Sequence, residues 1–171
     1  MHWLSFVGLL FSLVFIVIED FKIRRVRIAW FGFVFLFAST YAYYFIGLEK
    51  LLLYSVINLG FLSIQALLLV GYFILKHKRW INLTESYIGW GDVLFMLVIV
   101  SLFSPLSFIL YYLSSLILAL CIVLIYSLKG KALTQIPLAG IQALYLTALL
   151  CWNQFYKVVL FIDDFEILNK L

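Results

Sequence analysis

Charged side chains are scarce in this sequence of 171 residues, of which 12% are Asp, Glu, Lys or Arg and 67% are hydrophobic. A soluble domain carries about twice that share of charge, so this chain has more apolar surface than one core can bury. The same composition excludes a disordered chain. The net charge of +4 does not indicate a nucleic-acid partner, because the basic residues lie in short segments between apolar runs. We therefore expect an integral membrane protein, with the lipid bilayer as its first partner.

Cysteine and histidine are also rare. The two cysteines, Cys121 and Cys151, stand alone in apolar stretches without a CxxC pair, which favours packed, reduced thiols over a disulfide or a structural zinc site. His2 and His77 are isolated and lack the spacing of metal ligands. The sequence therefore predicts neither a metal site nor a cofactor.

Long apolar stretches alternate with polar loops and predict an all-α integral membrane protein with six transmembrane helices. The first stretch lacks the basic flank and the small-residue cleavage site of a signal peptide, so we expect it to be retained as a helix. Residues 1–155 are predicted to form the six-helix domain, and residues 156–171 a short amphipathic tail. The predicted helices are Trp3–Ile18, Ile28–Ile46, Leu51–Leu75, Ile88–Phe103, Ser107–Leu128 and Leu133–Phe155.

The basic residues predict the orientation of these helices. Nine of the twelve Lys and Arg residues fall in the first, third and fifth loops, and three fall in the second loop and the tail. Because basic loops remain in the cytoplasm, the odd loops are predicted to be cytoplasmic and both termini to lie outside.

Two acids then stand out, because ionisable residues at membrane depth are costly and usually functional. Asp20 ends the first predicted helix, and Asp92 lies near the start of the fourth. The orientation derived from the basic residues places both at the cytoplasmic face. Two neighbouring carboxylates share a proton, and such a pair suits peptide hydrolysis by an activated water. The alternative is that each acid only pairs with a nearby cation such as Arg24 or Arg25.

The setting of Asp92 is Gly89-Trp90-Gly91-Asp92. Glycines at a helix entry remove side-chain bulk and let an extended substrate strand approach the carboxylate. Gly89, Trp90 and Gly91 are therefore predicted to border a substrate groove. The alternatives are that the glycines serve helix packing and that Trp90 is an interface anchor.

Three segments together resemble the peptidase domain of the type IV prepilin peptidases and preflagellin peptidases, which are GxGD membrane aspartic proteases. Asp20, followed by a basic stretch, resembles the family's first motif, and the GxGD motif is matched in full. The segment 136–140, with Pro137, resembles the entry to the family's last helix. In place of the family's Pro-Asn after the first motif, this chain has Arg27-Ile28, and Leu94 replaces a frequent Lys.

The resemblance implies an aspartic endopeptidase of the bacterial inner membrane, with Asp20 and Asp92 as its catalytic pair and Pro137 beside the substrate. It implies a pilin-like precursor protein as the substrate, cut at a short basic leader on the cytoplasmic face. The chain lacks the CxxC segment that many bacterial members use for N-methylation, so it resembles the form with peptidase activity alone.

Other functions are compatible with the same sequence. The main alternative is a catalytically silent assembly or scaffold subunit with the same fold, whose acids are buried against arginines. A small proton-coupled transporter and a presenilin-like protease, which shares the GxGD motif, are weaker alternatives.

Overall fold

The computed structural model describes residues 2–78, 89–128, 137–156 and 164. All the regular elements within these ranges are α-helices, in agreement with the predicted all-α fold. They are α1 (His2–Ile23), α2 (Ile28–His77), α4 (Trp90–Ile99), α5 (Pro105–Leu128) and α6 (Leu138–Tyr156). The tail from residue 157 lies outside the described residues except for Asp164.

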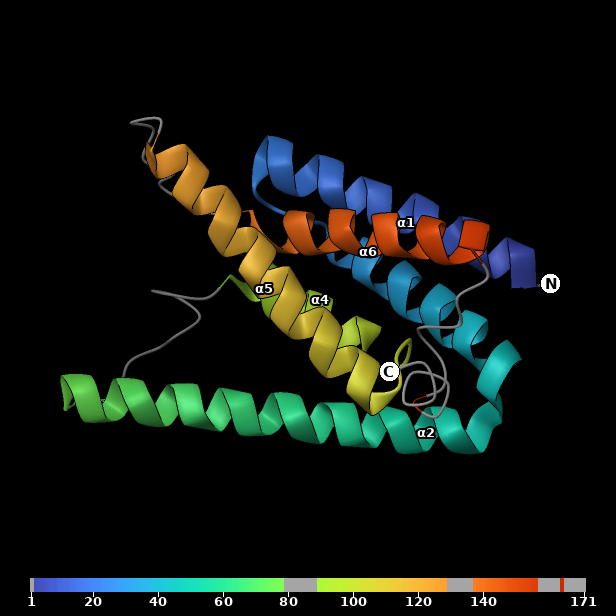
Figure 1. The fold of residues 1–171 in the computed structure, drawn as a ribbon, viewed down its shortest axis with the longest axis horizontal. Helices are drawn as coiled ribbons and strands as arrows, with labels where there is room; N and C mark the ends of the chain where they lie inside the picture. The colour runs from blue at the N-terminus through green and yellow to red at the C-terminus, as the bar shows by residue number, and fades with distance from the viewer. Residues whose placement is uncertain (1, 79–88, 129–136, 157–163, 165–171) are drawn as a thin grey trace.

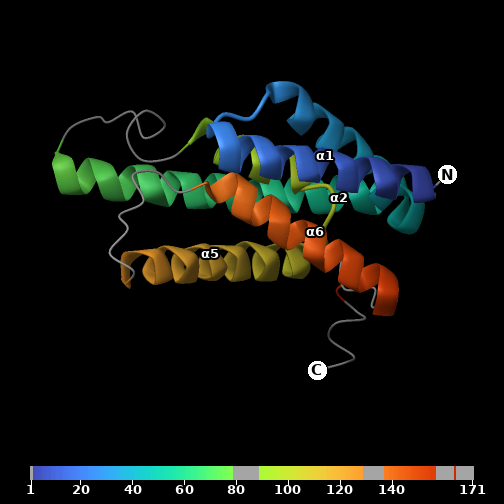
Figure 2. The same ribbon diagram turned by 90° about the horizontal axis from the view of Figure 1, so that it is seen from above.

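The helices run back and forth along one long direction (Figure 1). The end of α1 and the starts of α2, α4 and α6 gather at one end of the molecule, together with the ends of α2 and α5. We call this the dyad end, after the two acids Asp20 and Asp92, which lie at the end of α1 and the start of α4. The opposite end carries the start of α1, the turn within α2, the connection from α4 to α5 and the end of α6. Figure 2 shows α6 between α1 and α5, and it packs against both.

Helix α2 is broken at Gly47, whose φ of 73° and ψ of 174° are not helical. This backbone region is essentially restricted to glycine. The chain reverses there, so residues 28–46 form a first arm and residues 48–77 a second arm that returns towards the dyad end (Figure 1). The two helices predicted over Ile28–Ile46 and Leu51–Leu75 are therefore the two arms of one element.

The connection from α4 to α5 is fixed by buried polar groups. The amide of Asn58, on the second arm, donates hydrogen bonds to the carbonyls of Val100 and Phe103 over 2.9 and 3.0 Å. These bonds hold the chain in turns after Ile99, so α4 is only 10 residues long. Pro105 begins α5, because its fixed φ and missing N–H suit the first position of a helix.

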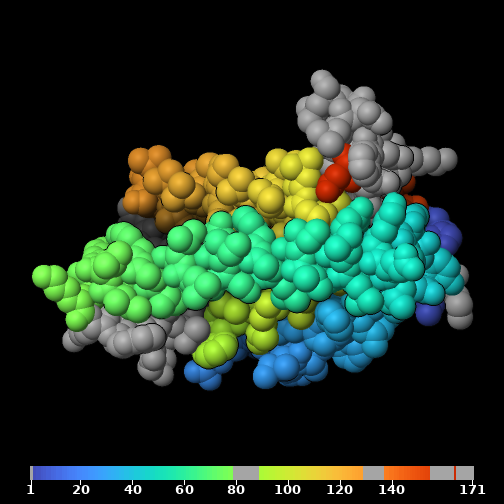
Figure 3. Space-filling model, turned by 90° about the horizontal axis from the view of Figure 1, so that it is seen from below, coloured from blue at the N-terminus to red at the C-terminus, as the bar shows by residue number. Residues whose placement is uncertain are grey.

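The core follows a stripe along one face of each helix. On α1 the stripe recurs every three or four residues and ends at the dyad end with Asp20, which is 9% exposed. The outer faces are apolar as well. Figure 3 shows the second arm of α2 lying across one face of the molecule, where Leu67 and Leu75 are 71% and 81% exposed. Such faces require lipid or protein rather than water around them.

The structure corrects several predicted helix boundaries. α1 continues to Ile23, because residues 19–22 are still helical. α4 ends before the expected Phe103, and α6 begins at Leu138. By length and composition, three of the described helices could cross a bilayer: α1, α2 and α5. With a length of about 15 Å, α4 covers half of the hydrocarbon core, so six complete crossings and the position of the termini stay predictions.

Gly47→Ala should destabilise the protein, because a Cβ is strained at this φ and ψ. We expect a loss of about 1–3 kcal/mol in the free energy of unfolding, measured by thermal or denaturant unfolding in detergent. The matched control is Gly60→Ala in the helical second arm, where an added Cβ meets no atom within 4 Å. This control should be neutral or gain up to about 1 kcal/mol. Equal stability of the two variants would contradict the assigned break.

Lys50 and Lys78 should lie on opposite sides of the membrane. They are exposed at the two ends of the second arm, which separates them by about 40 Å, more than the hydrocarbon core. In a chain with Cys121 and Cys151 replaced by Ser, a membrane-impermeant maleimide should label Lys78→Cys from the cytoplasmic side and Lys50→Cys from outside. Labelling of both from one side would contradict the arrangement.

Candidate functional site

The starts of α4 and α6 meet the last turn of α1 at the dyad end. Asp20 belongs to this last turn of α1, and Asp92 lies in the first turn of α4. Both side chains accept hydrogen bonds from the start of α6, over separations of 120 and 47 residues in the sequence. The structure therefore brings together the two acids that the sequence singled out.

The backbone of α6 determines how the acids are held. Ile141 N donates to the carbonyl of Pro137, which makes Pro137 the residue that precedes the first helical turn. The first N–H groups of a helix have no partner within it, and proline has no side-chain acceptor to offer them. Asp92 Oδ1 accepts from Ala139 N over 2.7 Å, and Asp20 Oδ2 accepts from Gly140 N over 2.6 Å. The two carboxylates thus replace the missing cap, one on each of two successive amides.

Glycine at two positions leaves room for the close approach of the two acids to the backbone. A Cβ on Gly140 would lie 3.0 Å from Asp20 Oδ2 and 3.0 Å from the ring of Phe21. A Cβ on Gly89 would lie 3.0 Å from Asp92 Oδ2. Gly89 therefore makes room for the Asp92 side chain, which folds back over the entry of its own helix. The sequence alone indicated Gly89 but not Gly140.

The electrostatics of Asp92 combine opposing effects. α4 is not one of the helices that could cross the membrane, and Asp92 lies at its entry. Burial, and to a smaller extent the charge of Asp20, raise the pKa of Asp92 to about 6 although the Ala139 amide opposes the shift. The charged group that acts on Asp92 is thus a like charge. The positive charge of the Arg24 guanidinium interacts with the Asp20 carboxylate. Of Arg24 and Arg25, which the sequence offered as cations near the acids, Arg24 is therefore the one whose charge acts on the pair.

The predicted groove residues lie beside the acids with different exposures. Trp90 is 63% exposed at the start of α4, and Pro137 is half-buried. A Cβ on Gly91 would have Phe31 Cζ, 3.9 Å away, as its nearest neighbour, so the fold itself has room for a side chain there. Packing within the described residues does not explain the glycine at position 91.

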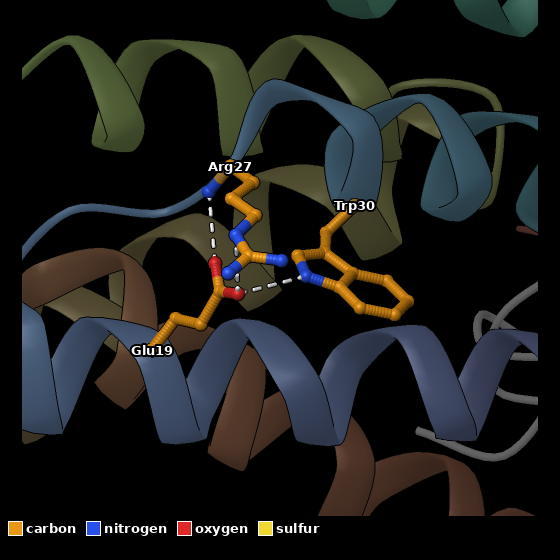
Figure 4. A network of polar contacts seen from close by, with 3 residues as sticks. All are labelled: Glu19, Arg27 and Trp30. Atoms are coloured by element: carbon orange, nitrogen blue, oxygen red, sulfur yellow. Dashed lines mark hydrogen bonds and ion pairs between the residues drawn. The ribbon is translucent and has the colours of Figure 1, made fainter.

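Glu19 has partners that the sequence analysis did not anticipate. Its carboxylate accepts a hydrogen bond from Arg27 N over 2.9 Å and one from Trp30 Nε1 over 3.1 Å (Figure 4). The Arg27 guanidinium lies 3.5 Å away. Arg27 is the position at which the chain departs from the resembled motif. Through its contacts with Glu19 it links the start of α2 to the end of α1. A backbone donor leaves no signature in the sequence, which is why this contact was missed.

Comparison of the chain with protein-family models, with curated proteins and with solved structures gives no significant match.

Replacing Asp20 by Asn should lower the pKa of Asp92, because it removes the neighbouring negative charge. Since burial is the larger cause of the shift, the pKa should stay above the value of about 4 of a free aspartate. Carboxyl ¹³C NMR of aspartate-labelled protein can follow this titration among only four aspartates. Glu49→Gln, at the opposite end of the molecule, should leave the pKa unchanged. An unchanged value in Asp20→Asn would show that the two carboxylates do not interact.

Proposed function

We propose that this protein is a membrane aspartic endopeptidase with Asp20 and Asp92 as its catalytic pair. The observation that carries the proposal is the placement of both carboxylates on successive amides at the start of α6. Acids from α1 and α4 thus converge on one point, although 72 positions of sequence separate them. A pair of acids with one shared proton is the arrangement that aspartic proteolysis needs.

The chemistry follows from the two protonation states of the pair. The ionised carboxylate takes a proton from a water molecule, and the resulting hydroxide forms a bond to the carbonyl carbon of the substrate peptide. The protonated carboxylic acid donates to the carbonyl oxygen, where negative charge develops. In the second step the C–N bond breaks and the leaving nitrogen receives a proton from the pair. With the pKa of Asp92 at about 6, the singly protonated pair is accessible near neutral pH.

Two features of the site favour an enzyme over a silent scaffold with acids neutralised by arginines. The charge that acts on Asp92 is that of Asp20, a like charge, whereas the positive charge of Arg24 acts on Asp20. Gly91 and the exposed Trp90 leave space along the entry of α4, next to Asp92. An extended peptide backbone could approach the carboxylate there.

The substrate and the location rest on the resemblance to the type IV prepilin peptidases. We propose a pilin-like precursor, cleaved after its short basic leader at the cytoplasmic face of the bacterial inner membrane. The three apolar helices that could cross a bilayer support a membrane location. Asp20 lies at the end of α1 and Asp92 at the start of α4, and these two helix ends lie towards the same end of the molecule (Figure 1), which supports a site at one membrane face.

Replacing either acid by Asn should abolish cleavage. We expect Asp20→Asn and Asp92→Asn each to lower the cleavage rate by about 10²–10⁴-fold, because each removes one half of the acid–base pair. The assay uses purified protein in detergent or vesicles and a synthetic pilin-like precursor with a basic leader followed by an apolar helix. Cleavage is followed by mass spectrometry.

Glu49→Gln is the control, because it likewise replaces one acid by its amide, but this acid is exposed and lies by the turn at Gly47, far from the dyad end. It should cleave at the rate of the parent protein. Normal processing by Asp20→Asn or Asp92→Asn would overturn the proposal.

A further inference from the structure

Glu19 and Asp20 are neighbours on α1 that face different parts of the molecule. Asp20 faces α6, where it accepts from Gly140 N. Glu19 faces the beginning of α2, where its two oxygens accept from Arg27 N and Trp30 Nε1 (Figure 4). Successive residues of a helix project about 100° apart, so the direction of one side chain determines that of the other.

The contacts of Glu19 are made to fixed groups. Arg27 N belongs to the backbone at the entry of α2. The indole of Trp30 is stacked on Phe15 of α1, with ring centroids 4.3 Å apart and planes inclined by 14°. By contrast, the Arg27 side chain is 79% exposed, and such an ion pair contributes little. The carboxylate of Glu19, itself 12% exposed, is therefore tied to α2 mainly by two N–H donors.

The last turn of α1 needs such contacts, because α1 ends at Ile23, only three residues after Asp20. Arg24 follows in a left-handed conformation with φ of 55°, and its N–H donates to the carbonyl of Asp20. Helix ends fray unless side-chain contacts hold them. A rotation of this turn would carry the Asp20 carboxylate away from Gly140 N and from Asp92.

From this geometry we infer that Glu19 is a positioning residue, which fixes the rotation of the last turn of α1 and thereby holds Asp20 in register with Asp92. The inference rests on the proposed peptidase function. Glu19 does not act on the substrate. Its contribution to the reaction comes through the direction of Asp20.

The kinetic test compares Glu19→Ala, Glu19→Gln and Arg27→Ala. Glu19→Ala should lower kcat by about 10–100-fold with little change in KM, because a displacement of about 1 Å of a catalytic group has effects of this size. Glu19→Gln should recover part of the rate, since its amide oxygen can replace only one of the two carboxylate oxygens that accept from Arg27 N and Trp30 Nε1. Arg27→Ala should change little, because its backbone N–H remains. A loss in Arg27→Ala equal to that in Glu19→Ala would overturn the assignment to the two N–H bonds.

The control Asn58→Ala distinguishes a positioning role of Glu19 from a purely structural one. This change removes two buried hydrogen bonds at the end of the molecule opposite the dyad. It should lower thermal stability while the folded protein keeps its kcat. If Glu19→Ala behaves in the same way, losing stability but not kcat, the inference is wrong.

A second readout does not depend on activity. With Cys121 and Cys151 replaced by Ser, Asp20→Cys should react slowly with a maleimide, because position 20 is 9% exposed. Adding Glu19→Ala should raise the labelling rate several-fold, whereas adding Asn58→Ala should not. An unchanged rate in the Glu19→Ala variant would overturn the inference. If the parent protein cleaves no precursor but Glu19→Ala still speeds labelling, the positioning role stands and the proposed peptidase function fails.

Discussion

The two hydrogen bonds from the start of α6 to Asp20 and Asp92 are the interaction on which the site depends. They satisfy two backbone donors that the helix itself cannot satisfy, and they provide partners for two largely buried carboxylates. Because the acids come from α1 and α4, the same bonds connect three helix ends. The steric consequence is that Gly140 and Gly89 leave room where a Cβ would press on a carboxylate oxygen.

The bonds also affect the ionisation of the two acids, on which opposing electrostatic effects act. The two amides and the positive end of the α6 dipole favour ionised carboxylates. Burial and the like charge of Asp20 favour a proton on Asp92, and together they prevail, with a pKa of about 6. The guanidinium of Arg24 offsets part of this conflict, because its positive charge favours the ionised form of Asp20. A pair that retains the conflict keeps a proton available, which is the property that the proposed proteolysis uses.

The opposite end of the molecule is held by neutral polar groups and by one carboxylate, that of Asp164, which accepts a hydrogen bond from Leu106 N over 3.5 Å. Asn58 holds the carbonyls after α4, the hydroxyls of Ser39 and Ser101 lie 2.9 Å apart, and the hydroxyl of Thr40 donates to that of Ser5. Such bonds satisfy polar groups inside an apolar protein without introducing charge. Asp20 and Asp92 thus lie at the end of the molecule where Lys76 and Lys78, at the end of α2, also lie.

The sequence by itself determined the helical class, the apolar outer faces and the choice of Asp20 and Asp92, because composition, periodicity and the cost of a buried charge are properties of the residues themselves. The tertiary structure decided the rest. It placed the break between the two predicted helices of α2 at Gly47, ended α4 beside the amide of Asn58, and made Arg27 and Trp30 the partners of Glu19. It also made Ala139 and Gly140 the partners of the dyad. Most of these outcomes depend on which backbone N–H or carbonyl group meets which side chain. Nearly all residue types carry these backbone groups, so their partners are settled only when the helices pack.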